Sequence, residues 1–252
     1  MAKQSKKEAE RLKAEEHKKQ LAEAKARRRA GGAIAGPEPT LKENPTLLIY
    51  CEGKNTEPSY FNKFKRSSVN VKAFGDGKNT VSLVKAAKKI AKKAADKGKP
   101  YEKVWCVFDA DPKPDNPNQL KNFNDAVVLA EKYGFGCAYS NQAFEYWLIL
   151  HFEDHQGGSM ARTDYDSKLN GYLNPLGLFY EGRDSKMVTQ DVFDLMFEEI
   201  GKDRQGNPIT RYRKAVERAR RNFDNIGDHS NPGKEESSTV VYKLVEELLG
   251  YV

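Results

Sequence analysis

The chain has 252 residues, of which 38% are hydrophobic and 31% are charged, and its formal net charge is +7. It contains no run of about 18 apolar residues, so no membrane-spanning helix is predicted, and its first residues lack the apolar region of a signal peptide. Residues 1–30 hold eleven Lys or Arg and five Glu, a net charge of +6, which leaves about +1 for the rest. The basic character therefore lies in the N-terminal segment and does not indicate a uniformly basic nucleic-acid-binding surface.

Residues 1–44 are predicted to form a basic arm and a linker. Residues 1–30 are rich in Ala, Glu, Lys and Arg, which favour helix, but they lack an apolar stripe that a helix could bury. We therefore expect either a solvated helix or a disordered arm, followed by a linker that contains Pro37 and Pro39.

Residues 45–155 alternate predicted strands with predicted helices. Apolar runs predict strands at 46–52, 69–74, 103–108 and 136–140. Helices are expected after the turn at 54–58, at 80–96 with Thr80 as the N-cap, at 119–133 and at 143–152. This alternation predicts an α/β domain with a parallel sheet of about four strands, flanked by helices and joined by right-handed crossovers.

The strand pattern ends at about residue 155. Helices are predicted at 163–173, 188–200, 209–223 and 237–249. Residues 156–252 are therefore predicted to form a helical C-terminal subdomain.

The three cysteines, Cys51, Cys106 and Cys137, all lie in predicted buried strands. An odd number of core thiols without metal-type spacing predicts a reducing compartment, and we expect a cytoplasmic location.

Acidic residues directly follow two of the predicted strands. Glu52 follows the first strand, and Asp109 and Asp111 follow the third. Ligands of open α/β sheets bind outside the carboxyl ends of the strands, so we expect these acids to meet there. Clustered carboxylates repel one another without a cation, and Mg²⁺ prefers oxygen ligands. The pattern therefore predicts a site for Mg²⁺, or for Mn²⁺, although each motif alone also fits ordinary turn acids.

The same motifs resemble a known family. Glu52-Gly53 and Asp109-Ala110-Asp111 match the two signatures of the Toprim domain. Longer runs that start at Cys51, Phe108, Ser140 and Asn231 resemble the RloB family, over roughly residues 45–250. The chain has Asn141-Gln142 where family members often have Asn-Pro, and the basic arm is not part of the resemblance.

The resemblance implies a Toprim-type, Rossmann-like fold for residues 45–155. It also implies a Mg²⁺-dependent endonuclease of bacterial antiviral defence, controlled by an ATPase partner of the RloA type. By position, Glu52, Asp109 and Asp111 would bind the metal and act in catalysis. The resemblance leaves open whether the substrate is RNA, including tRNA, or DNA, and whether the chain forms a homo-oligomer.

Glu145 is predicted to be a fourth catalytic residue. It lies in the first turn of the helix after the fourth strand, on the side that faces the other acids. It could bind metal or act as a base for water, or it could simply stabilise the helix N-terminus. Lys186 is a candidate, from residue type alone, for stabilising a phosphoryl group. Lys54 could bind phosphate or merely neutralise charge.

Other polar residues near these motifs are expected to be mainly structural. Thr56 and Glu57 begin a helix, and Asp115 is expected to form a turn. His151 and His155 have the i, i+4 spacing of a zinc pair, but no convincing third ligand accompanies them. We expect one packing histidine and one loop histidine.

Two basic groups are predicted to contact nucleic acid phosphates. The first is Arg27, Arg28 and Arg29 in the arm, which could equally dock a partner protein. The second is one face of the predicted helix 209–223, and it consists of Arg211, Lys214, Arg218 and Arg221. The alternative for this helix is a solvated charged face.

The leading functional hypothesis is a metal-dependent phosphodiesterase that acts on nucleic acid. Topoisomerase or primase activity is less consistent with the chain, which lacks room for DNA-gating domains and shows no nucleotide pocket. The main alternative is a non-catalytic module with a Toprim-like fold that binds nucleic acid or a partner.

Overall fold

The computed structural model describes residues 15–16, 18–20, 22–23, 44–64, 68–112, 115–116 and 118–251. The chain divides into two compact units, residues 1–43 and residues 44–252. In the first unit, the described residues are all helical and exposed. Arg27, Arg28 and Arg29 lie outside the described residues, so their contact with nucleic acid stays a prediction.

A four-stranded parallel sheet forms the centre of the second unit. Its strands are β1 (Thr46–Cys51), β2 (Asn70–Gly75), β3 (Lys103–Asp109) and β4 (Gly136–Ser140), in the order β2-β1-β3-β4. The inner strands β1 and β3 are buried along almost their whole length, as continuous apolar runs require. The predicted α/β fold with a parallel sheet of about four strands is confirmed, and it is of the Rossmann-like, Toprim type.

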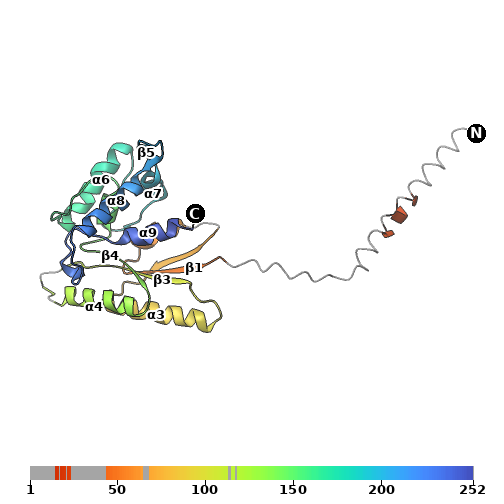
Figure 1. The fold of residues 1–252 in the computed structure, drawn as a ribbon, viewed down its shortest axis with the longest axis horizontal. Coiled ribbons are helices and arrows are strands. Elements are labelled where there is room, and N and C mark those ends of the chain that lie inside the picture. Colours follow the sequence, from red (N-terminus) through yellow and green to blue (C-terminus); the bar gives the residue numbers. More distant parts are fainter. Residues whose placement is uncertain are drawn as a thin grey trace, which may run out of the picture. The chain divides into compact units, whose positions relative to one another are not determined.

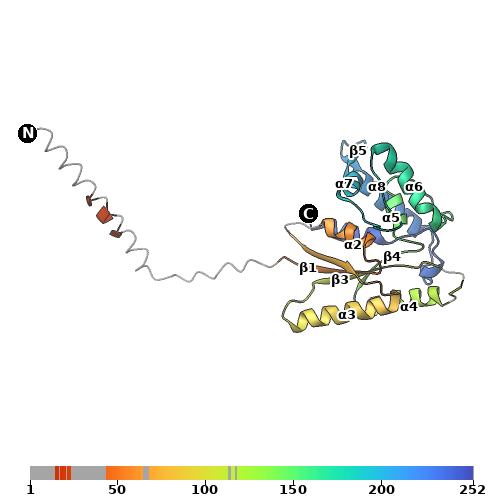
Figure 2. The same ribbon diagram turned by 180° about the vertical axis from the view of Figure 1, so that it is seen from behind.

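Helices cover both faces of this sheet (Figures 1 and 2). One face carries α3 (Thr80–Asp96) and α4 (Gln119–Lys132), and the other carries α2 (Thr56–Phe61) and α9 (Val241–Leu249). Leu83 and Ala87 of α3 are buried, whereas five lysines of the same helix are exposed, namely Lys85, Lys88, Lys89, Lys92 and Lys93. The amphipathic pattern of α3 thus fixes which side of the helix meets the sheet.

Both edge strands are covered near their carboxyl ends. On β2, the side-chain amide of Asn62 donates to the carbonyl oxygen of Ala73 at 2.7 Å and accepts from its N–H at 3.3 Å. On β4, Ser140 forms an antiparallel bridge with Thr239, and the N–H of Asn141 donates to the carbonyl oxygen of Ser238. These N–H and C=O groups of the edge strands, which no neighbouring strand pairs, therefore form hydrogen bonds within the chain.

The chain beyond residue 155 contains a hairpin that the sequence pattern does not predict. Its helices are α6 (Tyr165–Leu173), α7 (Gln190–Phe197), α8 (Arg211–Asp224) and α9. Between α7 and α8, strands β5 (Glu199–Lys202) and β6 (Pro208–Thr210) pair antiparallel. The expected absence of strands is wrong because β5 is exposed at every position, so it shows no apolar alternation. The division at residue 155 stays a prediction, since residues 44–252 form one compact unit in which α9 packs on β4.

Two predicted helix starts need correction. The N-cap of α3 is Asn79, and Thr80 is its first helical residue, with its side chain buried. The helix predicted at 143–152 is a shorter α5 (Glu145–Ile149). Among the described residues, no helix is long and apolar enough to cross a bilayer.

Candidate active site

The predicted acids meet in one pocket at the carboxyl end of the sheet. Strand order reverses between β1 and β3, and this is where open α/β sheets bind their ligands. Glu52 follows β1 and Asp109 ends β3, so the two residues flank this switch point. The pocket has a volume of about 140 Å³, and its polar lining residues include Glu52, Thr56, Glu57, Asp109, Asp111, Glu145, Arg162 and Lys186.

The Glu-Gly motif is explained by a close approach of Glu57. This carboxylate is buried, and its Oε1 accepts the N–H of Gly53 at 3.1 Å. A Cβ atom at Gly53 would lie 2.3 Å from Oε2 of Glu57, so only glycine fits without displacing that side chain. Burial raises the pKa of Glu57 to about 7, and the charges of Glu145 and Glu52 act in the same direction. Glu57 therefore belongs to the site, beyond the mainly structural role that its position predicts.

Asp109 links β3 to the start of α5. Its Oδ2 accepts the N–H of Phe144 at 3.1 Å, and its own N–H donates to Oε2 of Glu52 at 3.3 Å. Burial raises the pKa of Asp109 well above its ordinary value, and the nearby charges of Glu57, Glu145 and Glu52 raise it further. The charge of Arg162 acts in the opposite direction.

A chain of hydrogen bonds fixes Glu145. The hydroxyl of Tyr180 donates to its Oε1 at 2.9 Å and lies 3.3 Å from the hydroxyl of Thr56. Tyr180 is fully buried, and the side chain of Asn170 holds its backbone by two hydrogen bonds of 2.8 Å. Thr56, Tyr180 and Glu145 thus come from three separate segments and form one buried network.

Asp111 is paired with Arg162, which lies in the short 3-10 helix η2 (Arg162–Asp164). Burial alone would lower the pKa of Arg162, but the charges of Asp111 and Asp109 outweigh it and raise that pKa. The guanidinium therefore partly balances the carboxylates of the pocket.

Two residues of the pocket have a strained backbone. Asp111 has φ 38° and Lys186 has φ 49°, values in the left-handed region that residues with a side chain rarely adopt. The N–H of Lys186 donates to the carbonyl oxygen of Glu181 at 2.8 Å, and this hydrogen bond holds the strained backbone of Lys186 in place. Such strain persists where the surrounding structure enforces it, and it concentrates at functional sites.

Comparison with known families agrees with this geometry. A family model described as RloB-like protein matches residues 47–248, which is most of the chain. The chain belongs to the RloB-like family. Neither the curated proteins nor the solved structures give a match.

The donor set of this RloB-like pocket fits a divalent cation in its chemistry. Five carboxylates, those of Glu52, Glu57, Asp109, Asp111 and Glu145, face only two cationic side chains in the pocket lining. Hard cations such as Mg²⁺ take carboxylate oxygens. As they stand, however, no group of three or more His, Cys, Asp or Glu among the described residues is arranged to hold a metal ion. The hydrogen bonds and ion pair given above instead direct the carboxylates toward partners within the chain.

The other predicted site residues of this RloB-like chain lie elsewhere. Lys54 is exposed and does not line the pocket, and neither does Asp115, which is also exposed. His151 is buried with its Nδ1 3.0 Å from the carbonyl oxygen of Trp147, whereas Nδ1 of His155 lies 2.9 Å from the hydroxyl of Tyr146. These contacts agree with the expected packing histidine and loop histidine.

The basic face predicted on α8 is turned toward the protein. Arg218 donates to the carbonyl oxygen of Leu150 at 2.7 Å, and Arg221 donates to Asp154 at 2.7 Å. The four predicted cations are all half-buried, and the exposed positions of the helix are Arg213, Glu217, Arg220 and Asp224. The expected solvent-facing cationic stripe is therefore wrong in orientation, because long side chains bury their stems and use their charged ends in contacts within the chain. The role of these residues in nucleic acid binding stays a prediction.

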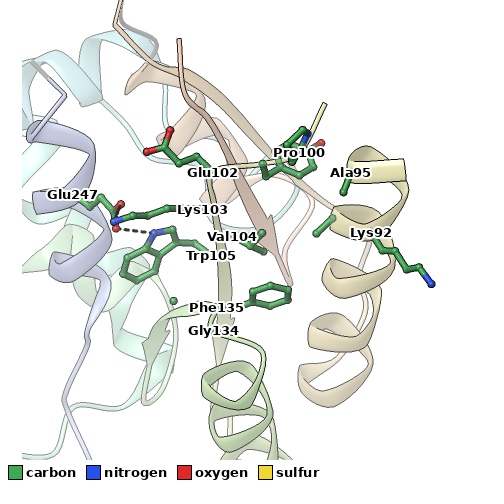
Figure 3. Close-up of a pocket in the computed structure, with 13 residues that line it drawn as sticks. Lys92, Ala95, Pro100, Glu102, Lys103, Val104, Trp105, Gly134, Phe135 and Glu247 are labelled. Carbon is green, nitrogen blue, oxygen red and sulfur yellow. Dashed lines mark hydrogen bonds and ion pairs between the residues drawn. The ribbon is translucent and has the colours of Figure 1, made fainter. Parts of the chain in front are cut away.

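A larger cavity, of about 660 Å³, lies at the amino end of the sheet and lacks the acid cluster (Figure 3). In it, the indole N–H of Trp105 donates to Glu247 at 3.1 Å, and Lys103 forms an ion pair with the same carboxylate at 2.5 Å. These contacts attach α9 to β3. They give the cavity a structural explanation, so its larger volume does not identify it as the functional site.

Arg162, Tyr180 and the site role of Glu57 escape the sequence analysis. Arg162 and Tyr180 lie in irregular segments beyond the sheet, where no strand end marks them. The only available signal for Glu57 is its position in the first helical turn, which equally fits an ordinary helix start.

Proposed function

We propose that this chain is a metal-dependent nuclease that hydrolyses phosphodiester bonds of RNA or DNA. The observation that supports it most is the pocket at the switch point, where five carboxylates and two cations share one small volume. Glu52, Asp109 and Asp111 would hold the metal. When bound, Mg²⁺ or Mn²⁺ supplies an activated water and stabilises negative charge on the phosphate.

Other residues in and beside the pocket would orient the attacking water and contact the phosphate. Tyr180 donates to Oε1 of Glu145 and so orients that carboxylate toward the pocket, where it would position the attacking water. Lys186 and Arg162 line the same pocket and would contact the phosphate of the substrate. For Asp111 to bind a cation, its pairing with Arg162 must change, which would free the guanidinium for the phosphate.

The family implies a place in bacterial antiviral defence and control by an ATPase of the RloA type, and we include both in the proposal. An unregulated nuclease in the cytoplasm would damage its host. Control by a partner is therefore consistent with the chemistry proposed for the pocket.

The proposal is tested with full-length protein, with and without its neighbouring ATPase, incubated with total RNA or plasmid DNA in Mg²⁺. We expect cleavage by the wild type and at least about a 10³-fold loss in the Asp109→Ala/Asp111→Ala variant, because the metal would lose two of its ligands. Glu102→Ala is the matched control, since Glu102 is an exposed acid at the opposite end of β3. Normal cleavage by the double variant would disprove the assignment. Absence of cleavage by the wild type, together with no metal-induced thermal shift, would favour a non-catalytic module.

A further inference from the structure

The acidic pocket is the first of three adjoining hollows. The second hollow, of about 280 Å³, shares Glu145, Arg162 and Lys186 with the first. The third, of about 580 Å³, shares Thr163, Asp166 and Gly182 with the second. We call the three together the groove. Its outer walls are the start of α6 and the loop at 178–186.

Cationic side chains occur along the whole groove. Arg162 and Lys186 line its first two parts, and the exposed Arg183 lines the third. Among the residues that the structure describes, neither Lys186 nor Arg183 takes part in an ion pair within the chain. Their positive charges are thus available to a ligand that carries repeated negative charge.

Two acids, Asp166 and Glu181, also line the outer groove, and both contact the loop that carries its cations. Glu181 accepts the N–H groups of Arg183, Asp184 and Ser185, so its carboxylate is used to close the loop. Asp166 packs against Gly182, where a Cβ atom would lie 2.0 Å from its carboxylate. Both acids therefore shape the loop that carries Arg183 and Lys186.

An exposed aromatic ring lies at the outer end of the groove. Phe179 lines the third hollow and is 58% exposed, although an apolar ring of this size is usually buried. The next residue, Tyr180, is fully buried and held by Asn170. The chain therefore fixes the backbone beside Phe179 and leaves the ring open to solvent.

We propose that the groove binds a single-stranded segment of nucleic acid, with phosphates along Arg162, Lys186 and Arg183 and an unpaired base stacked on Phe179. Positive charge that follows a backbone, combined with an aromatic platform for a base, is the general chemistry of single-strand binding. This inference rests on the proposed function, because it describes how the substrate of the acidic pocket leaves that pocket. A double helix keeps its bases stacked on one another and offers none to Phe179.

The first test measures binding of full-length protein to fluorescein-labelled 12-nucleotide RNA, DNA and duplex probes by anisotropy. EDTA is present, so cleavage does not interfere. Phe179→Ala should weaken single-strand binding roughly 5- to 100-fold, the range for loss of one stacked base. Arg183→Ala should reduce the slope of log affinity against log salt by about 0.7. Whether RNA or DNA binds more tightly identifies the kind of strand.

Matched controls separate the groove from the general surface. Leu176→Ala removes a side chain that is 51% exposed, and Arg204→Ala removes an exposed cation, and neither residue lines any of the three hollows. Both controls should bind like the wild type. Equal affinities of wild type and Phe179→Ala, or tighter binding of duplex than of single strand, would overturn the proposal.

The second test locates the bound strand, because the basic arm could also bind probe. A single-stranded probe that carries 5-iodouridine is cross-linked by light and the attached peptide is identified by mass spectrometry. Cross-links within residues 178–186 support the proposal, and cross-links confined to residues 1–44 overturn it. If the strand binds in the groove but no metal supports cleavage, the proposed nuclease function is wrong and the proposal of single-strand binding in the groove is supported. If cleavage depends on Asp109 but binding is unchanged by substitution of Phe179 and Arg183, the proposal of binding in the groove is wrong and the proposed nuclease function is supported.

Discussion

The two ends of the parallel strands carry hollows of opposite character. At the amino end, the charges of the larger cavity are matched, since one carboxylate, Glu247, meets both Lys103 and the indole N–H of Trp105. At the carboxyl end, the smaller pocket gathers five carboxylates and two strained residues, Asp111 and Lys186. The amino end is thus optimised for folding, whereas the carboxyl end retains repulsion and strain that folding alone does not require.

This difference shows that the chemistry of a pocket is more informative than its size. Mutual repulsion raises the pKa of Glu57 and Asp109 on top of the effect of burial, so the pocket is a source of instability that a cation or a proton can relieve. Four measurements can break or sharpen the contrast between the two ends.

The largest expected effect is a loss of stability with rising pH in the absence of metal. The folded-state pKa of Glu57 is about 7, above its ordinary value of 4.5. The folded state therefore holds this proton more tightly than the unfolded state, and the contribution is complete below about pH 4.5 and lost as pH rises through about 7. The loss should reach up to about 3 kcal/mol, measured as the free energy of unfolding in EDTA between pH 4.5 and 8.

Glu57→Gln should remove the part of this pH dependence that comes from Glu57 and leave the part that comes from Asp109, because glutamine keeps the acceptor for Gly53 but carries no titratable proton. Millimolar Mg²⁺ should also flatten the profile of the wild type, since it favours the ionised carboxylates. Identical pH profiles for the wild type and Glu57→Gln in EDTA would show that Glu57 is not the group responsible.

A smaller change in the free energy of unfolding should have opposite signs for substitutions at the two ends of the sheet. In EDTA at pH 7.5, Asp109→Asn should stabilise the fold by about 1–2 kcal/mol, because Asp109 must either stay ionised among like charges or take up a proton on folding, and asparagine does neither. Glu247→Gln should destabilise it by about 0.5–1 kcal/mol, because it weakens the contacts with both Lys103 and the indole N–H of Trp105. Denaturant unfolding measures both values. Destabilisation of similar size by both substitutions would remove the distinction between the two ends.

Tyr180→Phe should reduce metal-dependent cleavage about 10-fold, because Glu145 would lose the hydrogen bond that orients it. Tyr60→Phe is the matched control, since the hydroxyl of Tyr60 is also buried but Tyr60 does not line the pocket. Unchanged cleavage with lower thermal stability would assign Tyr180 a purely structural role.

The smallest effect is expected for Lys103→Met at the amino end. The side chain of Lys103 is 52% exposed, and pairs of this kind contribute little to stability. The free energy of unfolding should change by less than about 0.5 kcal/mol, and cleavage should be unchanged. A large change in cleavage would mean that the two ends are coupled through β3.

The parts of the site that belong to the sheet could be predicted from the sequence. Glu52 and Asp109 follow strands whose apolar runs are unmistakable, and parallel topology places both at one end of the sheet. Glu145 could be placed for the same reason, since its helix begins just beyond β4. Local sequence patterns predict these residues because, in a parallel sheet, a residue that directly follows a strand must lie at the carboxyl end of the sheet.

The remainder depends on tertiary contacts that no local pattern encodes. Arg162 lines the pocket from the short helix η2, where it pairs with Asp111, and Tyr180 reaches Glu145 from a loop whose backbone Asn170 holds. The orientation of α8 could not be predicted from its charge stripe because Arg218 finds its partner in a carbonyl oxygen of another segment. Charge patterning along a helix predicts its exposed face only when no such acceptor lies nearby.

The coverage of both edge strands has a consequence for assembly. Asn62 occupies the outward peptide group of Ala73 on β2, and residues 238–239 pair beside β4. Another chain therefore finds no open hydrogen-bonding row beside the carboxyl half of the sheet, and β-strand addition there is blocked. A regulatory partner of the kind proposed above would therefore contact this part of the sheet through side chains of the surrounding loops and helices. We therefore expect the side chains that such a partner recognises to lie among the surface residues of 153–187.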